Sequence, residues 1–288
     1  MLQISTNQLN GFIALSQNQN FHKAAERLYI TQSALSQRIR KLEQEIGSVL
    51  FIRNRANVCL TESGKKLLAY CNLMSGLESD YLNEIQNDGQ MNAEVRIATF
   101  SSLLRSVLIP MFSPLIRKHP GILMDWQWDE MFRLKGFMKE GKSDFVIADH
   151  EFNLQNVTCE LLGYEENVMI AAKDPGYEKN RSDVFLDHDA DDDMTQRFFE
   201  FNKITKRVRR SYLSDVYSLI EGVRQGLGRA VVSRHLLDLN EVRIIRKYKP
   251  LLTPVYLHYN TWPFYSKTQN LIISTLRKES KHYLKQIQ

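Results

Sequence analysis

Residues 21–47, FHKAAERLYITQSALSQRIRKLEQEIG, constrain the fold of this chain more than any other stretch. Small and apolar residues give a short first helix a face on which a second helix can pack closely, and a turn follows at Tyr29 and Ile30. Thr31 then supplies the hydroxyl that helix N-caps favour. Apolar residues recur beyond it at the three- and four-residue spacing of a buried helical stripe. They are Leu35, Ile39, Leu42 and Ile46.

This stripe leaves a short polar face on the opposite side of the second helix. Its members are Gln32, Ser33, Ser36, Gln37 and Arg40. In the DNA major groove Gln can bond adenine and Arg can bond guanine, each in a bidentate way. Helix-turn-helix proteins place the N-terminal residues of their second helix on base edges. Periodicity alone leaves two interpretations open, a DNA-reading helix and an ordinary solvated one.

The particular residues of this stretch favour a DNA-reading helix. The run AAERLYITQSALSQRIRKLEQEIGSVLFIR resembles the N-terminal domain of the LysR-type transcriptional regulators. The likeness includes the alanine pair, the TQSALSQ opening and KLE followed by a glycine. It implies a winged helix-turn-helix domain over residues 1–60, in which Thr31 and the polar face contact DNA.

A basic wing is expected after the second helix. Short apolar runs at residues 49–51 and 58–60 flank a basic tip. The resemblance implies that such a wing lies against the minor groove and the DNA backbone, with Arg53 and Arg55 as its contacts. Solvated loop arginines are the alternative.

The charge distribution also points to the N-terminal end. Residues 1–60 carry seven basic and three acidic residues, so +4 of the net charge of +5 lies there. An excess of positive charge at one end of a chain is typical of a nucleic-acid-binding domain.

The sequence indicates neither a membrane-spanning segment nor a disulfide framework. No apolar run approaches the length of a membrane span, and the start MLQISTNQLNGF lacks the pattern of a signal peptide, so we expect a cytoplasmic protein. Cys59, Cys71 and Cys159 are odd in number and form no CxxC pair, which argues against a disulfide framework and a zinc site.

A long helix is predicted to follow the wing over residues 61–88, capped by Thr61. Its apolar residues alternate at spacings of three and four, which is a heptad seam. A single projecting helix cannot bury such a seam against itself, so we expect a homodimer with an interrupted palindromic operator. Packing onto the chain's own later domain is the alternative. The seam consists of Leu67, Tyr70, Met74, Leu77 and Tyr81.

Residues 87–92, NDGQMN, are expected to form a hinge, and strands alternate with helices beyond it. This alternation predicts a mainly parallel sheet covered by helices. Strands are predicted at 95–98, 122–128, 145–148, 168–172, 184–186, 208–212, 230–233 and 255–259. Helices are predicted at 103–118, 131–139, 194–201, 216–225 and 267–285.

The segment VYSLIEGVRQGLGRAVVSRHLL resembles the effector-binding domain of the same family. The resemblance implies an α+β chain whose residues 92–288 form two α/β lobes like those of periplasmic binding proteins. Lobe I would comprise about 92–162 and 263–288, and lobe II about 163–262. It also implies a dimer of dimers (a homotetramer), contact with RNA polymerase, and a small-molecule effector with no cofactor or metal.

An effector would bind between the lobes, where strand-to-helix turns line a cleft. The small polar residues at these turns suit an amino acid or a small organic acid, although each could instead cap a helix. The predicted effector contacts are Thr99, Ser101, Ser102, Asp129, Asp149 and Ser211.

The segment VFLDHDADDDMTQRFF resembles the corresponding part of the arginine- and lysine-responsive regulators of basic amino acid export. That branch usually has an aspartate just past the first strand of the effector domain. Here that place is taken by Phe100, Ser101 and Ser102.

Other readings fit the sequence less well. A calcium loop starting at Asp187 would need glycine at Asp192 and glutamate at Phe198, so a solvated helix start is favoured there. The basic run 203–210 is assigned to the surface. GxSxG, GxxxxGK[ST], HExxH and a strand-linked GxGxxG are all missing, so we expect no enzyme. A DNA-tethered enzyme and a sequence-tolerant DNA organiser with a vestigial effector domain stay as rivals.

Overall fold

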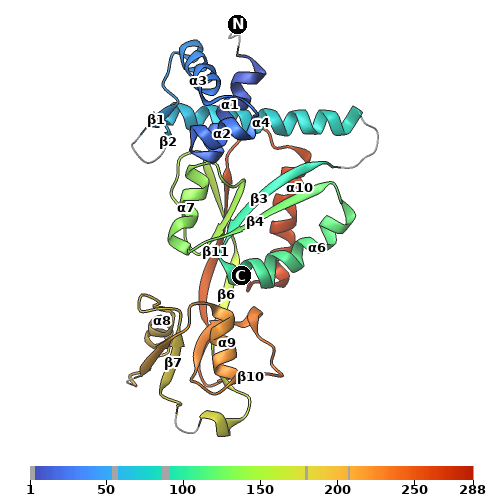
Figure 1. The fold of residues 1–288 in the computed structure, drawn as a ribbon. Helices are drawn as coiled ribbons and strands as arrows, with labels where there is room; N and C mark the ends of the chain where they lie inside the picture. The colour runs from blue at the N-terminus through green and yellow to red at the C-terminus, as the bar shows by residue number, and fades with distance from the viewer. Residues whose placement is uncertain (1–3, 54–57, 86–90, 179–180, 207, 288) are drawn as a thin grey trace.

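The computed structural model describes residues 4–53, 58–85, 91–178, 181–206 and 208–287, and arranges them in three levels. An N-terminal head lies at one end, with a long helix crossing beneath it, and two lobes follow one below the other (Figure 1). The C-terminus lies near the junction of the two lobes (Figure 1). The predicted hinge falls largely on residues 86–90, which lie outside the described residues.

The head is a three-helix unit with a small hairpin. Asn20 Oδ1 accepts hydrogen bonds from the amides of His22 and Lys23. Thr31 Oγ1 accepts one from Ala34, so the predicted Thr31 cap is confirmed. The turn between the second and third helices places Tyr29 at a φ of 53°. The elements are α1 (Thr6–Asn18), α2 (Phe21–Arg27), α3 (Gln32–Ile46), β1 (Phe51–Arg53) and β2 (Val58–Leu60).

The apolar stripe of α3 forms the centre of the head's core. Leu35, Ile39 and Leu42 are fully buried, together with Phe12 of α1. Ala24 of α2 is fully buried as well. Its small side chain lets α2 pack closely. The predicted two-helix motif is therefore present with its stripe inward.

The long helix α4 (Glu62–Ile85) starts at the predicted cap, where the Gly64 amide donates to Thr61 Oγ1 over 3.0 Å. Its first turns belong to the head, since Leu68 and Cys71 are buried in the head's core. Leu67 packs partly against that core too. The other four predicted seam residues are exposed: Tyr70 (48%), Met74 (45%), Leu77 (43%) and Tyr81 (63%).

The two lobes share one mixed sheet, so the prediction of a mainly parallel sheet is wrong in part. Among the described residues seven strands pair in the order β10-β6-β11-β5-β3-β4, with β9 also on β6. Strand β3 runs parallel to β4 and β5, whereas β6 and β11 are antiparallel to each other over their length. The sheet is mixed because these two long strands cross between the lobes in opposite directions.

The sequence pattern revealed only one end of each crossing strand, at 168–172 and 255–259. The sheet strands are β3 (Ala93–Thr99), β4 (Ile122–Trp128), β5 (Phe145–Ala148), β6 (Val157–Ala172), β9 (Ala230–Ser233), β10 (Val242–Ile244) and β11 (Leu251–Asn260). A separate parallel pair in lobe II consists of β7 (Val184–Asp187) and β8 (Arg209–Tyr212).

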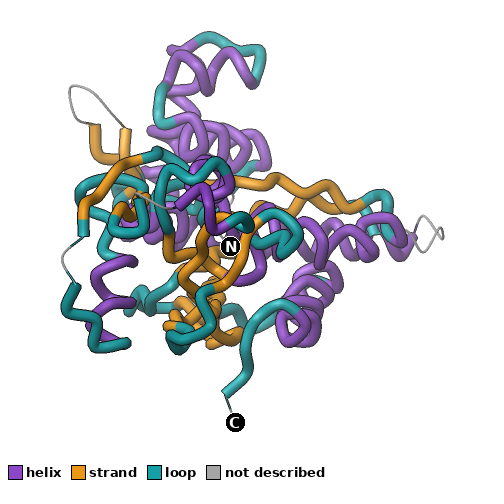
Figure 2. Tube along the Cα trace, turned by 90° about the horizontal axis from the view of Figure 1, so that it is seen from below, coloured by secondary structure: helices purple, strands orange, loops and turns teal. Residues whose placement is uncertain are grey.

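Helices cover both faces of the sheet in each lobe. In lobe I the core on one face includes α6 (Ile109–Lys118) and α10 (Lys267–Glu279), and α7 (Met131–Lys139) packs on the other. In lobe II, α9 (Val216–Arg224) and α8 (Met194–Phe201) occupy opposite faces. From below, the strands lie toward the centre with helices on several sides (Figure 2).

Two predicted helices are shorter or less regular than expected. The segment expected as one helix at 103–118 consists of α5 (Ser101–Leu103), a π-helical turn η1 (Leu104–Leu108) and α6. The interruption is understandable because Pro110 has no amide proton to donate to the carbonyl of Ser106. Helix α10 ends at Glu279 and is followed by the 3-10 turn η4 (Ser280–His282).

Candidate functional site

The exposed face at the start of α3 is the first candidate site. Gln32, Ser33, Gln37 and Arg40 are exposed, and Ser36 is half-buried. The Thr31 hydroxyl caps the helix and lies 3.0 Å from Ser33 Oγ, so the first turn is well defined. These side chains share one face because the buried stripe turns the opposite face inward. The face therefore offers amides, hydroxyls and a guanidinium to solvent.

The structure describes only part of the predicted wing. The hairpin forms as expected, with Phe51 opposite Leu60 and Arg53 opposite Val58. Arg55 lies outside the described residues, and Arg53 is described through its backbone.

The lobe I residues of the predicted effector site meet at one edge of the sheet. Thr99, Asp129 and Asp149 follow or end the neighbouring strands β3, β4 and β5, and the Asp129 amide donates to the Thr99 carbonyl over 3.2 Å. The Thr99 side chain is fully buried, and its hydroxyl donates to the Ile147 carbonyl over 3.0 Å. Thr99 therefore acts first as a structural link between β3 and β5.

The other predicted effector residues are more accessible. Ser101 and Ser102 lie half-buried in α5, and Asp149 Oδ1 is 2.7 Å from His150 Nδ1. Asp129 Oδ1 accepts a hydrogen bond from the Glu130 amide over 2.7 Å. Ser211 lies in lobe II, within β8 and opposite Leu186 of β7.

Contacts between the lobes come from residues that the sequence did not single out. The Arg105 guanidinium of η1 stacks over the Tyr217 ring of α9 at 4.1 Å from the ring centroid. Burial raises the pKa of Tyr217, so the phenol stays neutral.

Beside this contact, a polar network joins lobe I to the crossing strands. Ser106 Oγ lies 2.7 Å from His235 Nδ1, and His235 Nε2 lies 2.7 Å from Glu165 Oε1. Ser233 Oγ lies 3.0 Å from Glu165 Oε1 and 3.0 Å from Asn167 Oδ1, within hydrogen-bonding distance of both. These residues lie far apart in the sequence and form no motif, so only the fold brings them together.

The acidic and basic runs of lobe II are packed against each other. Asp187 is 2% exposed, and its carboxylate accepts hydrogen bonds from Arg210 Nε and Thr195 Oγ1, both over 2.5 Å. Arg210 also donates to the backbone carbonyls of Ala190 and Asp192. The assignment of the basic run to the surface is therefore wrong for Arg210, and Asp187 is not part of a solvated helix start.

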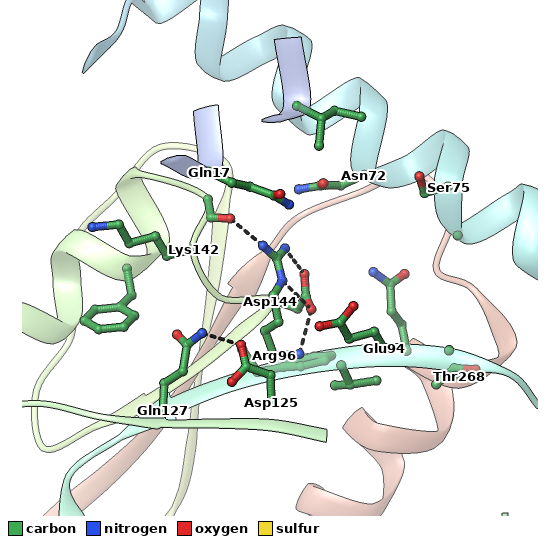
Figure 3. Close-up of a pocket in the computed structure, with 18 of the residues that line it drawn as sticks. Gln17, Asn72, Ser75, Glu94, Arg96, Asp125, Gln127, Lys142, Asp144 and Thr268 are labelled. Atoms are coloured by element: carbon green, nitrogen blue, oxygen red, sulfur yellow. Dashed lines mark hydrogen bonds and ion pairs between the residues drawn. The ribbon is translucent and has the colours of Figure 1, made fainter. Parts of the chain in front are cut away.

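A cavity of about 600 Å³ lies where the head, α4 and lobe I meet (Figure 3). Arg96 of β3 lies at its centre and pairs with Asp144, with Nη2 and Oδ1 2.6 Å apart. None of the six predicted effector residues lines this cavity. Its polar lining comes from the head, α4 and lobe I, and includes Gln17, Asn72, Ser75, Glu94, Asp125, Gln127 and Lys142.

The described helices include none with the length and apolarity needed to cross a bilayer.

Comparisons with known proteins match both halves of the chain. The model of the bacterial regulatory helix-turn-helix proteins of the lysR family matches residues 6–65, and that of the LysR substrate binding domain matches residues 88–263. The HTH-type transcriptional regulator ArgP of Aeromonas salmonicida is 34% identical over 160 residues, which are 55% of this chain and 53% of that protein. HdfR of Shigella boydii serotype 18 is 31% identical over 164 residues, which are 56% of this chain and 58% of that protein.

The aligned stretch thus spans somewhat more than half the length of each relative. Two solved structures share the fold over nearly their whole length. ArgP from Mycobacterium tuberculosis has a TM-score of 0.77 at 21% identity, covering 99% of this chain and 100% of that one. Full-length LysG from Corynebacterium glutamicum with bound effector Arg has a TM-score of 0.72 at 19% identity, covering 96% and 98%.

Proposed function

Because this chain belongs to the LysR family of bacterial helix-turn-helix regulators, we propose that it is a sequence-specific, DNA-binding transcription regulator controlled by a small-molecule effector. The observation that supports this most directly is the mostly exposed polar face of α3, opposite a stripe whose Leu35, Ile39 and Leu42 are fully buried. We place its action in the cytoplasm and assign it no catalytic activity.

In this proposal the start of α3 enters the major groove. Gln32, Gln37 and Arg40 read base edges, because amide and guanidinium groups can form paired hydrogen bonds with adenine and guanine. Thr31, Ser33 and Ser36 contribute hydroxyl contacts, and Arg53 and Arg55 hold the wing against the duplex.

We propose that the protein acts as a pair of chains joined along α4. The exposed apolar residues of α4 are Tyr70, Met74, Leu77 and Tyr81, and pairing with a second copy along them would remove them from water. The resulting homodimer, or a homotetramer made from two such dimers, would carry recognition helices in two-fold-related pairs. It would therefore bind an interrupted palindrome, and from there it could contact RNA polymerase.

The effector is proposed to bind between the two lobes, as an amino acid or a small organic acid. Ser101, Ser102, Asp129 and Asp149 follow strands β3, β4 and β5 at one edge of the lobe I sheet, and Ser211 of β8 would contribute from lobe II. Hydroxyls and carboxylates together suit a zwitterion. Thr99, with its hydroxyl already bonded, would shape the site rather than bind through its side chain.

The DNA-binding part is tested by selecting bound fragments from random DNA with the full-length protein. Sequencing should recover an interrupted, two-fold-related site. Recovery of fragments without any common motif would contradict the proposal.

The effector part is tested by thermal unfolding of the protein with arginine, lysine, other amino acids and organic acids. A ligand that binds only the folded state raises its stability, by about 2.7 kcal/mol at a hundred times its dissociation constant. Asp129→Asn should reduce the shift, whereas Asp191→Asn, at an exposed acid outside the cleft, should preserve it. Equal shifts in both variants would exclude Asp129 from the site.

A further inference from the structure

Tyr29, in the turn between α2 and α3, has a backbone conformation that tyrosine rarely adopts. Its φ of 53° lies in the left-handed region. Two hydrogen bonds close the turn around it. The Ile30 amide donates to the Ala25 carbonyl over 3.0 Å, and the Tyr29 amide donates to the Glu26 carbonyl, also over 3.0 Å. This pair of bonds is the Schellman ending of a helix, in which the left-handed position is usually a glycine.

The Tyr29 side chain lies almost entirely in solvent. It is 97% exposed, whereas its neighbours Leu28 and Ile30 pack partly against the head's core. Asn153 and Asn156 also have a positive φ, but asparagine tolerates this conformation better than a bulky residue does. A strained residue whose side chain packs so little is found where function requires that side chain.

The position of Tyr29 suggests what that function is. It lies two residues before Thr31, the N-cap of the proposed DNA-reading helix, and Thr31 and Gln32 are exposed as well. A helix with its side chains is about 10 to 12 Å across, and the major groove is about 12 Å wide. A helix therefore fills the groove, and the turn that leads into it must pass close to the phosphates at the groove's edge.

We propose that Tyr29 is a further DNA-contacting residue, whose phenol O–H donates a hydrogen bond to a phosphate oxygen beside the major groove. This inference rests on the proposed DNA binding and adds a contact that positions α3 without reading a base. Because tyrosine is uncharged, the contact displaces no counterion and should act on every DNA sequence alike. These properties distinguish it from Gln32, proposed to read a base, and from Arg53, a cation of the wing.

Fluorescence anisotropy of the full-length protein with the selected operator and with random DNA tests the contact. Tyr29→Phe keeps the ring and the backbone and removes only the hydroxyl. It should weaken binding to both DNAs by the same factor, roughly tenfold, as expected for a hydrogen bond to a charged group. The dependence of affinity on salt should keep the wild-type slope. Tyr212→Phe, at an exposed tyrosine of lobe II, is the matched control and should bind like the wild type.

A second variant separates the contact from the stability of the head. Tyr29→Gly relieves the left-handed backbone, so it should unfold at no lower a temperature than the wild type. It should nevertheless lose at least as much DNA affinity as Tyr29→Phe, whereas a damaged head would lose stability together with affinity. Asn153→Gly makes a comparable backbone change at an exposed site of lobe I and should leave DNA binding unchanged.

A single uncharged methylphosphonate, placed in turn at each phosphate beside a half-site, locates the partner of Tyr29. At one position it should weaken binding by the wild type and have little effect on Tyr29→Phe. A wild type without preference for the operator would overturn the proposed function, while Tyr29→Phe would still be compared on random DNA. Equal affinities of the wild type, Tyr29→Phe and Tyr29→Gly would overturn the Tyr29 contact alone.

Discussion

At the scale of single residues, the start of α3 carries the DNA-reading proposal. The Thr31 cap fixes the first turn, and the stripe of Leu35, Ile39 and Leu42 fixes which face is left to solvent. Gln32, Gln37 and Arg40 on that face are exposed and lie outside the head's core. Their replacement should therefore alter DNA binding without altering stability, which separates their role from that of the capping residue.

Gln32→Ala should weaken binding to the selected site by about 1 to 3 kcal/mol and leave binding to random DNA nearly unchanged, because a base contact is lost and phosphate contacts remain. Fluorescence anisotropy at fixed salt measures both affinities. Gln44→Ala, also exposed but near the end of α3, is the control and should bind like the wild type. An equal loss on both DNAs would refute base reading by Gln32.

Thr31→Ala should lower the free energy of unfolding by about 1 kcal/mol, since the Ala34 amide loses its cap, while Thr31→Ser should retain most of it. Urea denaturation followed by circular dichroism gives the difference. No change in Thr31→Ala would show that the cap is unimportant to stability.

A buried histidine should make stability depend on pH. Burial lowers the pKa of His258 to about 4, and the neutral ring accepts a hydrogen bond from the Phe152 amide over 3.3 Å. In the unfolded chain a histidine binds a proton near pH 6.5. The free energy of unfolding should therefore fall as the pH drops from 6.5 towards 4, by up to about 1.4 kcal/mol per pH unit from this group.

The check is urea denaturation between pH 7.5 and 4.5. His258→Gln should show a shallower pH dependence, and His282→Gln, an exposed site, should follow the wild type. Identical slopes in His258→Gln and wild type would assign the pH dependence to other groups.

Sequence patterns predicted the residues whose role is local and missed those whose role depends on tertiary contacts. The Thr31 and Thr61 caps and the α3 stripe follow from residue types and spacing within one helix. Arg210 was misassigned because its partner Asp187 is 23 positions away and is buried by the packing of lobe II. The Ser106–His235–Glu165 network has no sequence signal for the same reason.

At the scale of elements, α4 combines two roles along one helix. Its first turns complete the head's core through Leu68 and Cys71, and its later turns expose Met74 and Leu77. Of the five predicted seam residues, Leu67 packs partly against the head, and only the later four are exposed and available to a partner.

Met74→Glu should weaken the proposed dimer by about 2 kcal/mol or more, roughly thirtyfold in the dissociation constant, because an apolar side chain that the pairing would bury becomes a charge. Sedimentation velocity over a concentration series measures this change. Leu239→Glu replaces an apolar side chain of lobe II that is 51% exposed and should have no effect. Dimers of unchanged strength in Met74→Glu would place the interface elsewhere.

The crossing strands were the elements hardest to predict. Residues 157–167, VTCELLGYEEN, include three glutamates and a glycine, which is unlike a buried strand. They form β6 nonetheless because β11 pairs with them along most of their length, from Asn167 opposite Leu251 to Val157 opposite Asn260. Backbone pairing over this distance, rather than side-chain pattern, determines the strand.

At the scale of the whole molecule, the chain is a column with the head at one end and the two lobes below it (Figure 1). The sequence predicted the order of head, linker helix and lobes. It gave no sign of the cavity at their junction, which is lined by residues as far apart as Gln17 and Gln269. In the proposed mechanism, an effector that prefers one arrangement of the lobes shifts the population of head orientations.

The central claim is that this chain reads DNA sequence, and the most direct test compares its affinity for the selected operator with that for shuffled DNA of equal length and salt. The full-length protein should prefer the operator by about 4 kcal/mol or more, roughly a thousandfold in affinity. Nearly equal affinities would contradict it, and would indicate a sequence-tolerant DNA organiser instead.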